Sequence, residues 1–299
     1  MNASAAYLSS LFDLSDQQAY LAWRERKLTE APRRAADLVV EIEDIGRLSE
    51  AEHGAILQRV RRCNMAVYQE APKPGRDDKA AVQAFARAFG LERLDANVLA
   101  DEDGITPLAV HREGSRARYI PYTERPIAWH TDGYYNTLPE RAVRSVLLHC
   151  VNPAAAGGAN RLMDYEILYI RLRDEDPAHI AALMRPDAMT IPPNAEEGLE
   201  RQATPGPVFF LDRGGNLCMR YTARARNVVW SDDPAVVAAA AAIRRLLDGP
   251  DELILQHRLA AGQGLIGNNV LHTREPFSDD PASPRLLYRA RFYDRVAGS

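Results

Sequence analysis

Two residues of types that bind metals, His130 and Asp132, stand two positions apart in the segment Ile127–Tyr135, which we expect to be extended. Residues two apart on a strand project to the same side, so this imidazole and this carboxylate would face one cavity. A distant histidine would complete a triad of two histidines and one carboxylate, which suits non-heme Fe(II) with open positions for a co-substrate and oxygen. His272, in the run Asn269–Arg274, is the candidate for that third ligand.

The His-x-Asp spacing is common, and other interpretations stay open. His130 also fits a core histidine bonded to a carbonyl group, and Asp132-Gly133 also fits a turn. A second pair with this spacing, His111 and Glu113, lies in a charged run with a glycine, which predicts a loop.

A basic segment near the C-terminus alternates strictly and predicts a strand. One face would carry Leu286, Tyr288, Ala290 and Phe292, and the other Arg285, Leu287, Arg289, Arg291 and Tyr293. A guanidinium group in a cavity holds a carboxylate with two parallel hydrogen bonds. The alternative is an edge strand whose basic face is solvated.

Four motifs in this order, His130-Thr131-Asp132, Gly157–Asn160, Asn269–His272 and Arg285-x-x-x-Arg289, resemble the taurine dioxygenase family of Fe(II)/2-oxoglutarate-dependent oxygenases. That family includes enzymes similar to clavaminate synthase. The similarity covers most of the chain. It implies an α+β fold with a mainly β core, a double-stranded β-helix (jelly roll) flanked by α-helices.

The resemblance also implies roles for individual residues. His130, Asp132 and His272 would bind Fe(II), and Arg285 would bind the distal carboxylate of 2-oxoglutarate. Asn160 stands where the family has a threonine that helps to hold 2-oxoglutarate, and its amide can still donate to a carboxylate. Arg289 would lie near 2-oxoglutarate or an anionic group of the prime substrate.

Further residues bear on the prime substrate. Tyr135 and Asn136, just beyond the first two ligands, are expected to contact it. Pro126 replaces the polar residue that taurine dioxygenases share four positions before the first histidine, which argues against taurine itself. No separate acid or base residue is expected.

The implied reaction is the oxidation, by default hydroxylation, of a C–H bond in a small molecule that bears a carboxylate or an amine. 2-Oxoglutarate and O2 would be co-substrates, and succinate and CO2 would be released. Two alternatives remain. A cupin-type metalloenzyme would not use 2-oxoglutarate and would not need Arg285, and a non-catalytic binding protein of the same fold would retain its ligand without Asp132.

The elements around these residues predict one domain over residues 1–299, with a helical extension at 1–37 and a jelly-roll core with helical insertions at 38–295. Local signals predict helices within 5–26, 49–62, 80–89 and 234–247, strands at 38–42 and 65–68, and a hairpin about 213–216. The run Gly262–Gly267 fits GxGxxG, but the residues after it, with two asparagines, a valine and a proline, do not predict a helix. We therefore expect a tight turn before the strand of His272 rather than a dinucleotide site.

Composition restricts the class of protein. The 299 residues are 46% hydrophobic and 26% charged, with a net charge of −4, so no global positive field favours a nucleic-acid partner. No apolar run reaches the length of a membrane span, and three cysteines without CxxC spacing favour a reducing cytoplasm. The expected partner is a small molecule, with a homo-oligomer left open.

Overall fold

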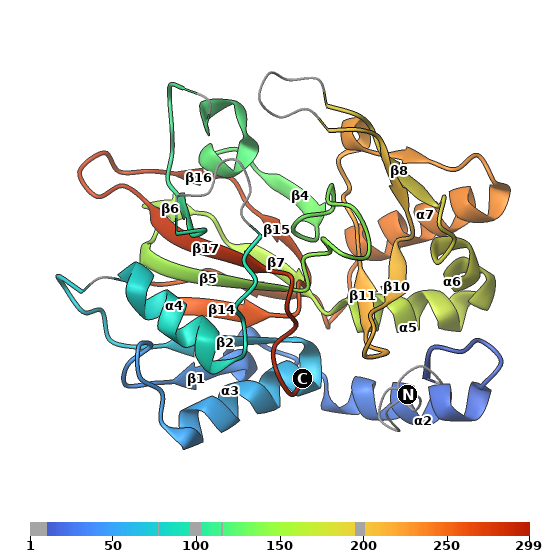
Figure 1. The fold of residues 1–299 in the computed structure, drawn as a ribbon, viewed down its shortest axis with the longest axis horizontal. Coiled ribbons are helices and arrows are strands. Elements are labelled where there is room, and N and C mark those ends of the chain that lie inside the picture. Colours follow the sequence, from blue (N-terminus) through green and yellow to red (C-terminus); the bar gives the residue numbers. More distant parts are fainter. Residues whose placement is uncertain (1–10, 77, 96–102, 115, 195–200) are drawn as a thin grey trace. The chain divides into compact units, whose positions relative to one another are not determined.

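The computed structural model describes residues 11–76, 78–95, 103–114, 116–194 and 201–299 (Figure 1). The chain divides into two compact units whose segments alternate along the sequence. Unit 1 consists of Met1–Ala31, Trp129–Ala142 and Met163–Ile254, and unit 2 consists of Pro32–Ala128, Val143–Leu162 and Leu255–Ser299. Both units combine helices and strands, so the chain has a mixed α/β fold.

Unit 2 is built on a six-stranded sheet in the order β1-β2-β14-β5-β17-β3. Only β1 and β2 pair in parallel, and the other neighbours are antiparallel. The strands are β1 Val39–Glu41, β2 Met65–Gln69, β3 Thr106–Leu108, β5 Ser145–Asn152, β14 Gln263–Gly267 and β17 Leu286–Phe292.

A four-stranded sheet in the order β13-β7-β15-β4 faces the six-stranded one. Its strands are β13 Leu255–His257, β7 Asn160–Met163, β15 Leu271–Arg274 and β4 Ile127–His130, and the unit boundary falls within β4. One apolar cluster takes side chains from both sheets, among them Val67, Leu162, Leu255, Leu265 and Leu287. A small ladder of β6 Ala156–Gly157 and β16 Phe277–Ser278 accompanies them.

Two helices cover the other face of the six-stranded sheet, α3 Glu50–Cys63 and α4 Asp78–Ala88 (Figure 1). Ile56 and Phe85 of these helices pack with Leu147 and Phe292 of the sheet in a second apolar cluster. Short 3-10 helices lie at Ala35–Leu38 (η1), Arg116–Arg118 (η2) and Ile120–Tyr122 (η3). The six-stranded sheet of unit 2 is therefore buried on both faces.

Unit 1 is mainly helical. Its helices are α2 Gln17–Glu30, α5 Tyr165–Glu175, α6 Pro177–Leu183 and α7 Pro234–Asp248. A three-stranded sheet joins β12 Val229–Trp230, β8 Met189–Ile191 and β9 Thr204–Gly206, and a hairpin joins β10 Phe209–Leu211 to β11 Leu217–Met219. Lys27 of α2 is buried and forms ion pairs with Asp164 and Glu166 at the start of α5, which fixes α2 against α5.

Most of the local predictions are confirmed. Helix α3 has the expected capping box, in which Ser49 Oγ accepts from the Glu52 N–H and the Glu52 carboxylate accepts from the Ser49 N–H. Helix α4 is followed by Gly90 with a φ of +70°, and the hairpin and α7 form where expected. The run 262–267 does not open a helix, but it is not the expected tight turn before the strand of His272 either. Only Gly262, with a φ of +78°, lies in a turn, and Gln263–Gly267 form strand β14.

The helical prediction for 5–26 is confirmed where it falls on described residues, because Leu11 is helical and α2 begins at Gln17, where Asp16 caps it. Residues 5–10 of that prediction lie outside the described residues. One prediction was wrong in extent. The strand expected to reach Tyr135 ends at His130, because Gly133, with a φ of +66°, lies in a turn. The alternative of a turn at Asp132-Gly133 is therefore correct for that part of the segment.

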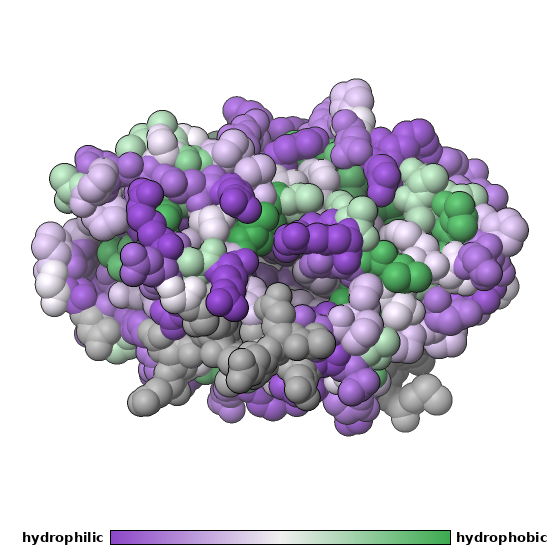
Figure 2. All heavy atoms as spheres, turned by 90° about the horizontal axis from the view of Figure 1, so that it is seen from above, coloured by the Kyte–Doolittle hydropathy of each residue, from purple (hydrophilic) through white to green (hydrophobic). Residues whose placement is uncertain are grey.

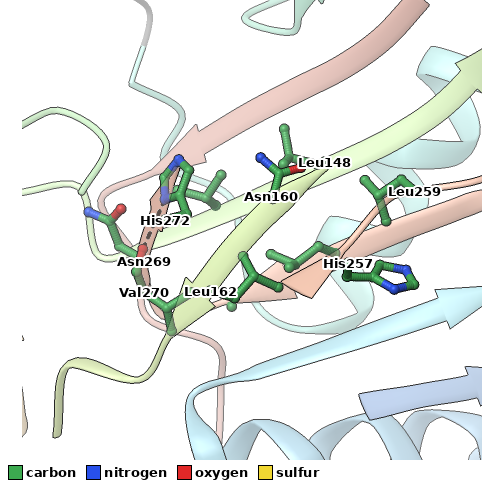
Figure 3. Close-up of a pocket in the computed structure, with 11 residues that line it drawn as sticks. Leu148, Asn160, Leu162, His257, Leu259, Asn269, Val270 and His272 are labelled. Atoms are coloured by element: carbon green, nitrogen blue, oxygen red, sulfur yellow. Dashed lines mark hydrogen bonds between the residues drawn. The ribbon is translucent and has the colours of Figure 1, made fainter. Parts of the chain in front are cut away.

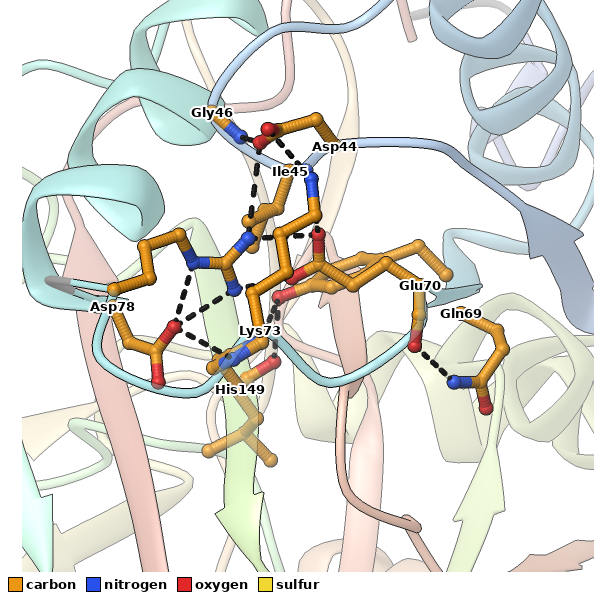
Figure 4. Close-up of polar contacts among 11 residues, drawn as sticks. Asp44, Ile45, Gly46, Gln69, Glu70, Lys73, Asp78 and His149 are labelled. Carbon is orange, nitrogen blue, oxygen red and sulfur yellow. Dashed lines mark hydrogen bonds and ion pairs between the residues drawn. The ribbon is translucent and has the colours of Figure 1, made fainter.

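A network of charged side chains, which we call the Glu70 network, lies at the end of β2 (Figure 4). The Glu70 carboxylate is fully buried and forms an ion pair with Arg76, whose Nη1 is 2.8 Å from Glu70 Oε2. Arg76 Nε also donates to Asp78 at 2.8 Å, and Lys73 pairs with Asp44 at 2.6 Å. Since each buried charge in the network has an opposite partner, its burial is tolerated.

His149 of β5 extends this network into the core. Its ring is 1% exposed, and Nδ1 lies 3.0 Å from the Tyr68 hydroxyl. Alternation along β5 places His149 on the helix-covered face of the sheet, whereas its neighbour Leu148 lines the space between the two sheets. His149 therefore belongs to the Glu70 network and not to that inter-sheet space.

The surface in Figure 2 is mainly hydrophilic, with apolar residues in small scattered groups. Large apolar side chains that are exposed, such as Leu21, Val229 and Val237, occur singly, as is normal for globular proteins. Within the described part of the chain, no helix has the length and apolar character needed to cross a bilayer.

Candidate active site

In unit 1, the residues next to His130 are held by a backbone ladder. His130 forms an antiparallel bridge with Thr222, and on either side the Thr131 N–H donates to Tyr221 O at 3.0 Å and the Ala223 N–H donates to Trp129 O at 2.8 Å. Thr131 is fully buried, and its hydroxyl accepts from the Tyr221 N–H at 3.0 Å. This ladder fixes the backbone from which the His130 side chain projects.

Two residues close to His130 in the chain, Trp129 and Asp132, are buried. Trp129 is 4% exposed, and its indole N–H donates to Leu247 O at the end of α7 at 3.1 Å. Asp132 is itself only 6% exposed, and it lies at the first position of the turn that contains Gly133. A buried carboxylate requires a partner, and a metal ion is one such partner.

In unit 2, a pocket opens between the two sheets (Figure 3). Its walls are apolar and come from Val146, Leu148, Leu162, Leu259, Leu265 and Val270. His272, Asn160 and Asn269 add polar groups, and His257 also lines the pocket, with its ring turned away from them (Figure 3). An apolar pocket with a few convergent polar groups is typical of a small-molecule site.

The ring of His272 is oriented by its own strand. Its Nδ1 lies 3.0 Å from the backbone oxygen of Val270 (Figure 3). Because a carbonyl oxygen can only accept, we assign the proton to Nδ1, which leaves the lone pair on Nε2. Metal-binding histidines are commonly fixed by this kind of hydrogen bond.

Three arginines gather beside β15 and β17. The Arg285 guanidinium lies 4.8 Å and that of Arg274 5.0 Å from the ring of Phe277. Burial lowers the pKa of Arg274 to about 9, and the charges of Arg285 and Arg289 contribute to this decrease. Burial likewise lowers the pKa of Arg285 from its ordinary value. A bound carboxylate would relieve the repulsion among these cations.

Arg274 is a residue that the sequence analysis did not assign. Its guanidinium donates to the backbone oxygens of Pro121 (3.0 Å), Ile120 (3.3 Å), Thr123 (2.5 Å) and Arg125 (2.6 Å). The only sequence signal for Arg274 was its place two residues after the predicted ligand His272, in the run His272-Thr273-Arg274. Arg274 therefore fastens the segment 120–125, which leads into β4, to strand β15.

The residues of the expected basic face of β17 have different surroundings along the strand. Leu287 packs into the cluster between the sheets, and Ala290 and Phe292 pack under the helices, so the alternation is confirmed, with a bulge at Leu286/Leu287. Arg291, however, is 3% exposed and forms an ion pair of 2.6 Å with Asp95. The expectation that the whole basic face could hold a carboxylate is therefore wrong for Arg291, because Asp95 already neutralises it.

Other predicted contacts have defined surroundings. Asn160 lines the pocket, and its Nδ2 donates to Thr273 O at 2.6 Å, which leaves a second N–H on that amide. The half-exposed Tyr135 lies 5.6 Å from the Arg201 guanidinium, whereas Asn136 donates to Arg141 O at 3.0 Å within the turn. The rival pair at His111 and Glu113 lies in a loop, as expected.

The residues predicted to bind iron or 2-oxoglutarate come from both units. His130 and Asp132 belong to unit 1, whereas His272, Arg285, Asn160 and Arg289 belong to unit 2. The described residues contain no group of three histidine, cysteine or carboxylate side chains that could hold a metal ion. The roles of these six residues therefore stay predictions.

Comparison with known proteins identifies the family. The model of the family "Taurine catabolism dioxygenase TauD, TfdA family" matches residues 26–291. A uridine-5'-phosphate dioxygenase from Streptomyces sp is 35% identical over 223 residues, which are 70% of this chain and 77% of that protein. A second one, from Amycolatopsis sp, is 32% identical over 180 residues, which are 57% and 62% of the two chains.

Solved structures show the same fold at low identity. An asparagine oxygenase in complex with Fe(II), 2S,3S-3-hydroxyasparagine and succinate aligns with a TM-score of 0.59 at 15% identity over 97% of this chain and 88% of that one. The non-heme iron oxygenase OrfP in complex with Fe and alpha-ketoglutaric acid aligns with a TM-score of 0.61 at 16% identity, over 98% and 92%. The chain belongs to the taurine catabolism dioxygenase TauD, TfdA family and is an oxidoreductase of the Fe(II)- and 2-oxoglutarate-dependent dioxygenase class.

Proposed function

We propose that this protein hydroxylates a nucleoside 5'-monophosphate such as uridine 5'-phosphate, with Fe(II) held by His130, Asp132 and His272 and with 2-oxoglutarate held by Arg285. The observation that carries the proposal is the orientation of His272, whose Nδ1–H donates to Val270 O and whose Nε2 is thereby prepared for a metal. Two imidazoles and one carboxylate are the donor set of non-heme Fe(II) oxygenases.

These residues fit the chemistry of the iron site. Asp132 is almost fully buried, so its carboxylate would gain from a cation. When bound, the iron supplies the activation of oxygen that no side chain of this protein provides. The protein's own groups bind and orient the co-substrate and the prime substrate. The apolar walls of the inter-sheet pocket exclude water from them.

The arginine cluster supports the assignment of the co-substrate. Arg285 and Arg274 are 6% and 5% exposed, and with the half-buried Arg289 they make a cationic region that suits the distal carboxylate of 2-oxoglutarate. Asn160 has one amide hydrogen occupied by Thr273 O, and its second one is proposed to donate to 2-oxoglutarate. Arg289 is proposed to bind either 2-oxoglutarate or the prime substrate.

The two facing sheets of unit 2 are proposed to be the core of a double-stranded β-helix. The similarity to the two oxygenase structures supports this interpretation. The buried free cysteines Cys63, Cys150 and Cys218 support a reducing, cytoplasmic location.

The prime substrate is inferred from the two relatives, both of which are uridine-5'-phosphate dioxygenases. Such a nucleotide has the anionic group that the sequence analysis expected, as a phosphate rather than a carboxylate. Tyr135 and Asn136 remain proposed contacts of this substrate.

The first experiment is an anaerobic optical titration of the apo-protein with Fe(II) and then 2-oxoglutarate. We expect the weak visible charge-transfer band of a keto acid chelated to ferrous iron. Arg285→Ala should lose the band at the same 2-oxoglutarate concentration, whereas Arg47→Ala, at an exposed position of unit 2, should retain it. Admission of O2 with uridine 5'-phosphate should then yield succinate and oxidised nucleotide in equal amounts.

Variants of the ligands complete the test. His130→Ala, Asp132→Ala and His272→Ala should each lose iron affinity, and a variant with wild-type affinity would remove that residue from the ligand set. Iron binding without a band would instead indicate a metalloenzyme that does not use 2-oxoglutarate. Absence of iron binding would indicate a binding protein.

A further inference from the structure

A segment of unit 1 beside His130 is basic and has no role in the proposed function so far. Residues 222–227 follow the ladder to Trp129 and Thr131, and they include Arg224 and Arg226. Arg224 is half-buried and Arg226 is exposed. Because His130 and Thr222 form an antiparallel bridge, their side chains lie on the same side of the ladder.

Arg224 shares that side. Its backbone is extended, with φ −74° and ψ 100°, so residues 222 and 224 project in the same direction. The Arg224 N–H donates to the Thr222 hydroxyl at 3.3 Å, which holds this local arrangement. The Arg224 side chain therefore leaves the backbone on the same side of the ladder as that of His130.

The charge of this segment is not neutralised by the described part of the chain. Among the described residues, neither Arg224 nor Arg226 forms an ion pair with a carboxylate. Other arginines of unit 1, such as Arg185 and Arg245, do have carboxylate partners. Arg220 differs, because it is 2% exposed and donates to the backbone oxygens of Thr204, Met189 and Gly206. Arg220 thus stabilises unit 1, and Arg224 and Arg226 are left for a ligand.

A tyrosine hydroxyl adds a neutral donor at the end of this basic segment. Asn227 Nδ2 donates to the Tyr134 hydroxyl at 2.7 Å, which joins the end of the basic segment to the turn after Asp132. Since the Tyr134 oxygen accepts this bond, its own hydrogen can be donated to another acceptor. The ring of Tyr134 meets that of Tyr135 edge to face, with centroids 5.3 Å apart.

We propose that Arg224, Arg226 and the Tyr134 hydroxyl bind the phosphate group of the prime substrate. Two guanidinium groups and one hydroxyl match a phosphate, which carries up to two negative charges and accepts hydrogen bonds through its oxygens. The proposal rests on the proposed function, because it locates the group that distinguishes a nucleoside 5'-monophosphate from the nucleoside. All of its residues belong to unit 1.

The test is anaerobic calorimetry of the protein loaded with Fe(II) and 2-oxoglutarate, titrated with uridine 5'-phosphate and separately with uridine. We expect the wild type to bind the phosphate ester more tightly. Arg224→Gln and Arg226→Gln should each weaken its binding by about 10- to 100-fold, the value of a charge-assisted hydrogen bond. Tyr134→Phe should weaken it less, and uridine binding should not change.

The matched control is Arg213→Gln, at an exposed hairpin position of the same unit, which should bind both ligands as the wild type does. An unchanged 2-oxoglutarate band in each variant shows that the metal site is intact, and Arg224→Met, which also removes the charge, serves if Arg224→Gln does not fold. Retention of the preference for uridine 5'-phosphate in both glutamine variants would overturn the phosphate site alone. A wild type without that preference would overturn the proposed substrate as well.

Discussion

At the scale of single residues, chemistry is decided by the immediate partners of each group. His272 is oriented by Val270 O, two positions away, so its strand alone prepares it as a ligand. Arg291 and Arg285 lie close together along the chain with similar burial, yet Arg291 meets Asp95, whereas Arg285 lies beside Phe277 and other cations. The same residue type is therefore structural at one position and suited to binding at the other.

The buried His149 gives a prediction at this scale. Burial lowers its pKa below the ordinary value of 6.5, although Asp78 and Glu70 partly offset the effect. In the unfolded chain the imidazole takes up a proton below pH 6.5, whereas in the folded protein it resists protonation until a lower pH. The neutral, buried imidazole of His149 therefore contributes fully to the free energy of unfolding above its pKa in the unfolded chain. That contribution is lost as the pH falls from there through its lower pKa in the folded protein.

We therefore expect wild-type stability in urea to fall between about pH 7.5 and about pH 5, and His149→Gln to reduce that dependence, by at most about 1.4 kcal/mol per pH unit. Glutamine can still accept from the Tyr68 hydroxyl. His257, whose pKa is also lowered by burial, remains in both proteins, so the difference isolates His149. Equal pH dependence in the two proteins would contradict the prediction.

At the scale of elements, short pieces of chain place the arginine cluster. Strand β16 carries Phe277 and pairs with β6 through Gly157, which has a φ of +72°. A Cβ atom at this position would lie 2.4 Å from Pro276 O and 3.1 Å from Phe277 Cα. Gly157 thus allows two strands to approach so closely that the Phe277 ring can contact both Arg274 and Arg285.

Replacement of Gly157 by alanine should therefore displace β16. We expect a loss of roughly 2 to 4 kcal/mol in the free energy of unfolding, from the left-handed backbone and from the clash, and a weaker affinity for 2-oxoglutarate. Chemical denaturation and the optical titration measure the two effects. Gly75→Ala is the matched control, because Gly75 has a φ of +80° but no atom within 4 Å of the added carbon. Equal losses in the two variants would show that the approach of the strands is not the cause.

At the scale of the whole molecule, the two units are not separate stretches of sequence. Each consists of three segments, so the chain passes from one unit to the other five times. Neither unit can be cut out as a continuous fragment, and the segments of each are joined through the other. This interleaving favours one cooperative unfolding transition, as expected for a single domain.

Intrinsic probes can test this. Trp23, Trp129 and Trp230 all belong to unit 1, whereas the buried Cys63 and Cys150 belong to unit 2. In urea, tryptophan fluorescence and pulsed labelling of these two thiols should give the same midpoint. Two separated midpoints would show that the units unfold independently and would contradict the prediction of a single domain.

The sequence by itself determined the features that depend on neighbours a few residues away. The capping box of α3, the glycine after α4 and the alternation of β17 were predictable, because their hydrogen bonds and faces are set within one or two turns or strand repeats. The family was also predictable, since its motifs occur in order along the chain. The end of β4 at His130 was missed because a local turn at Gly133 overrides the extended pattern.

Only the tertiary structure decided which distant groups meet. Arg274 contacts Pro121 across 153 positions, and Tyr293 donates to Asp95 across 198, and no local pattern specifies such partners. Long-range pairing depends on how sheets and loops pack. This packing lets Arg274 hydrogen-bond to the backbone of the loop 120–125, and it places Arg291 in a buried ion pair. It also left Arg224 and Arg226 as cations beside the strand of His130, from which we inferred a phosphate site.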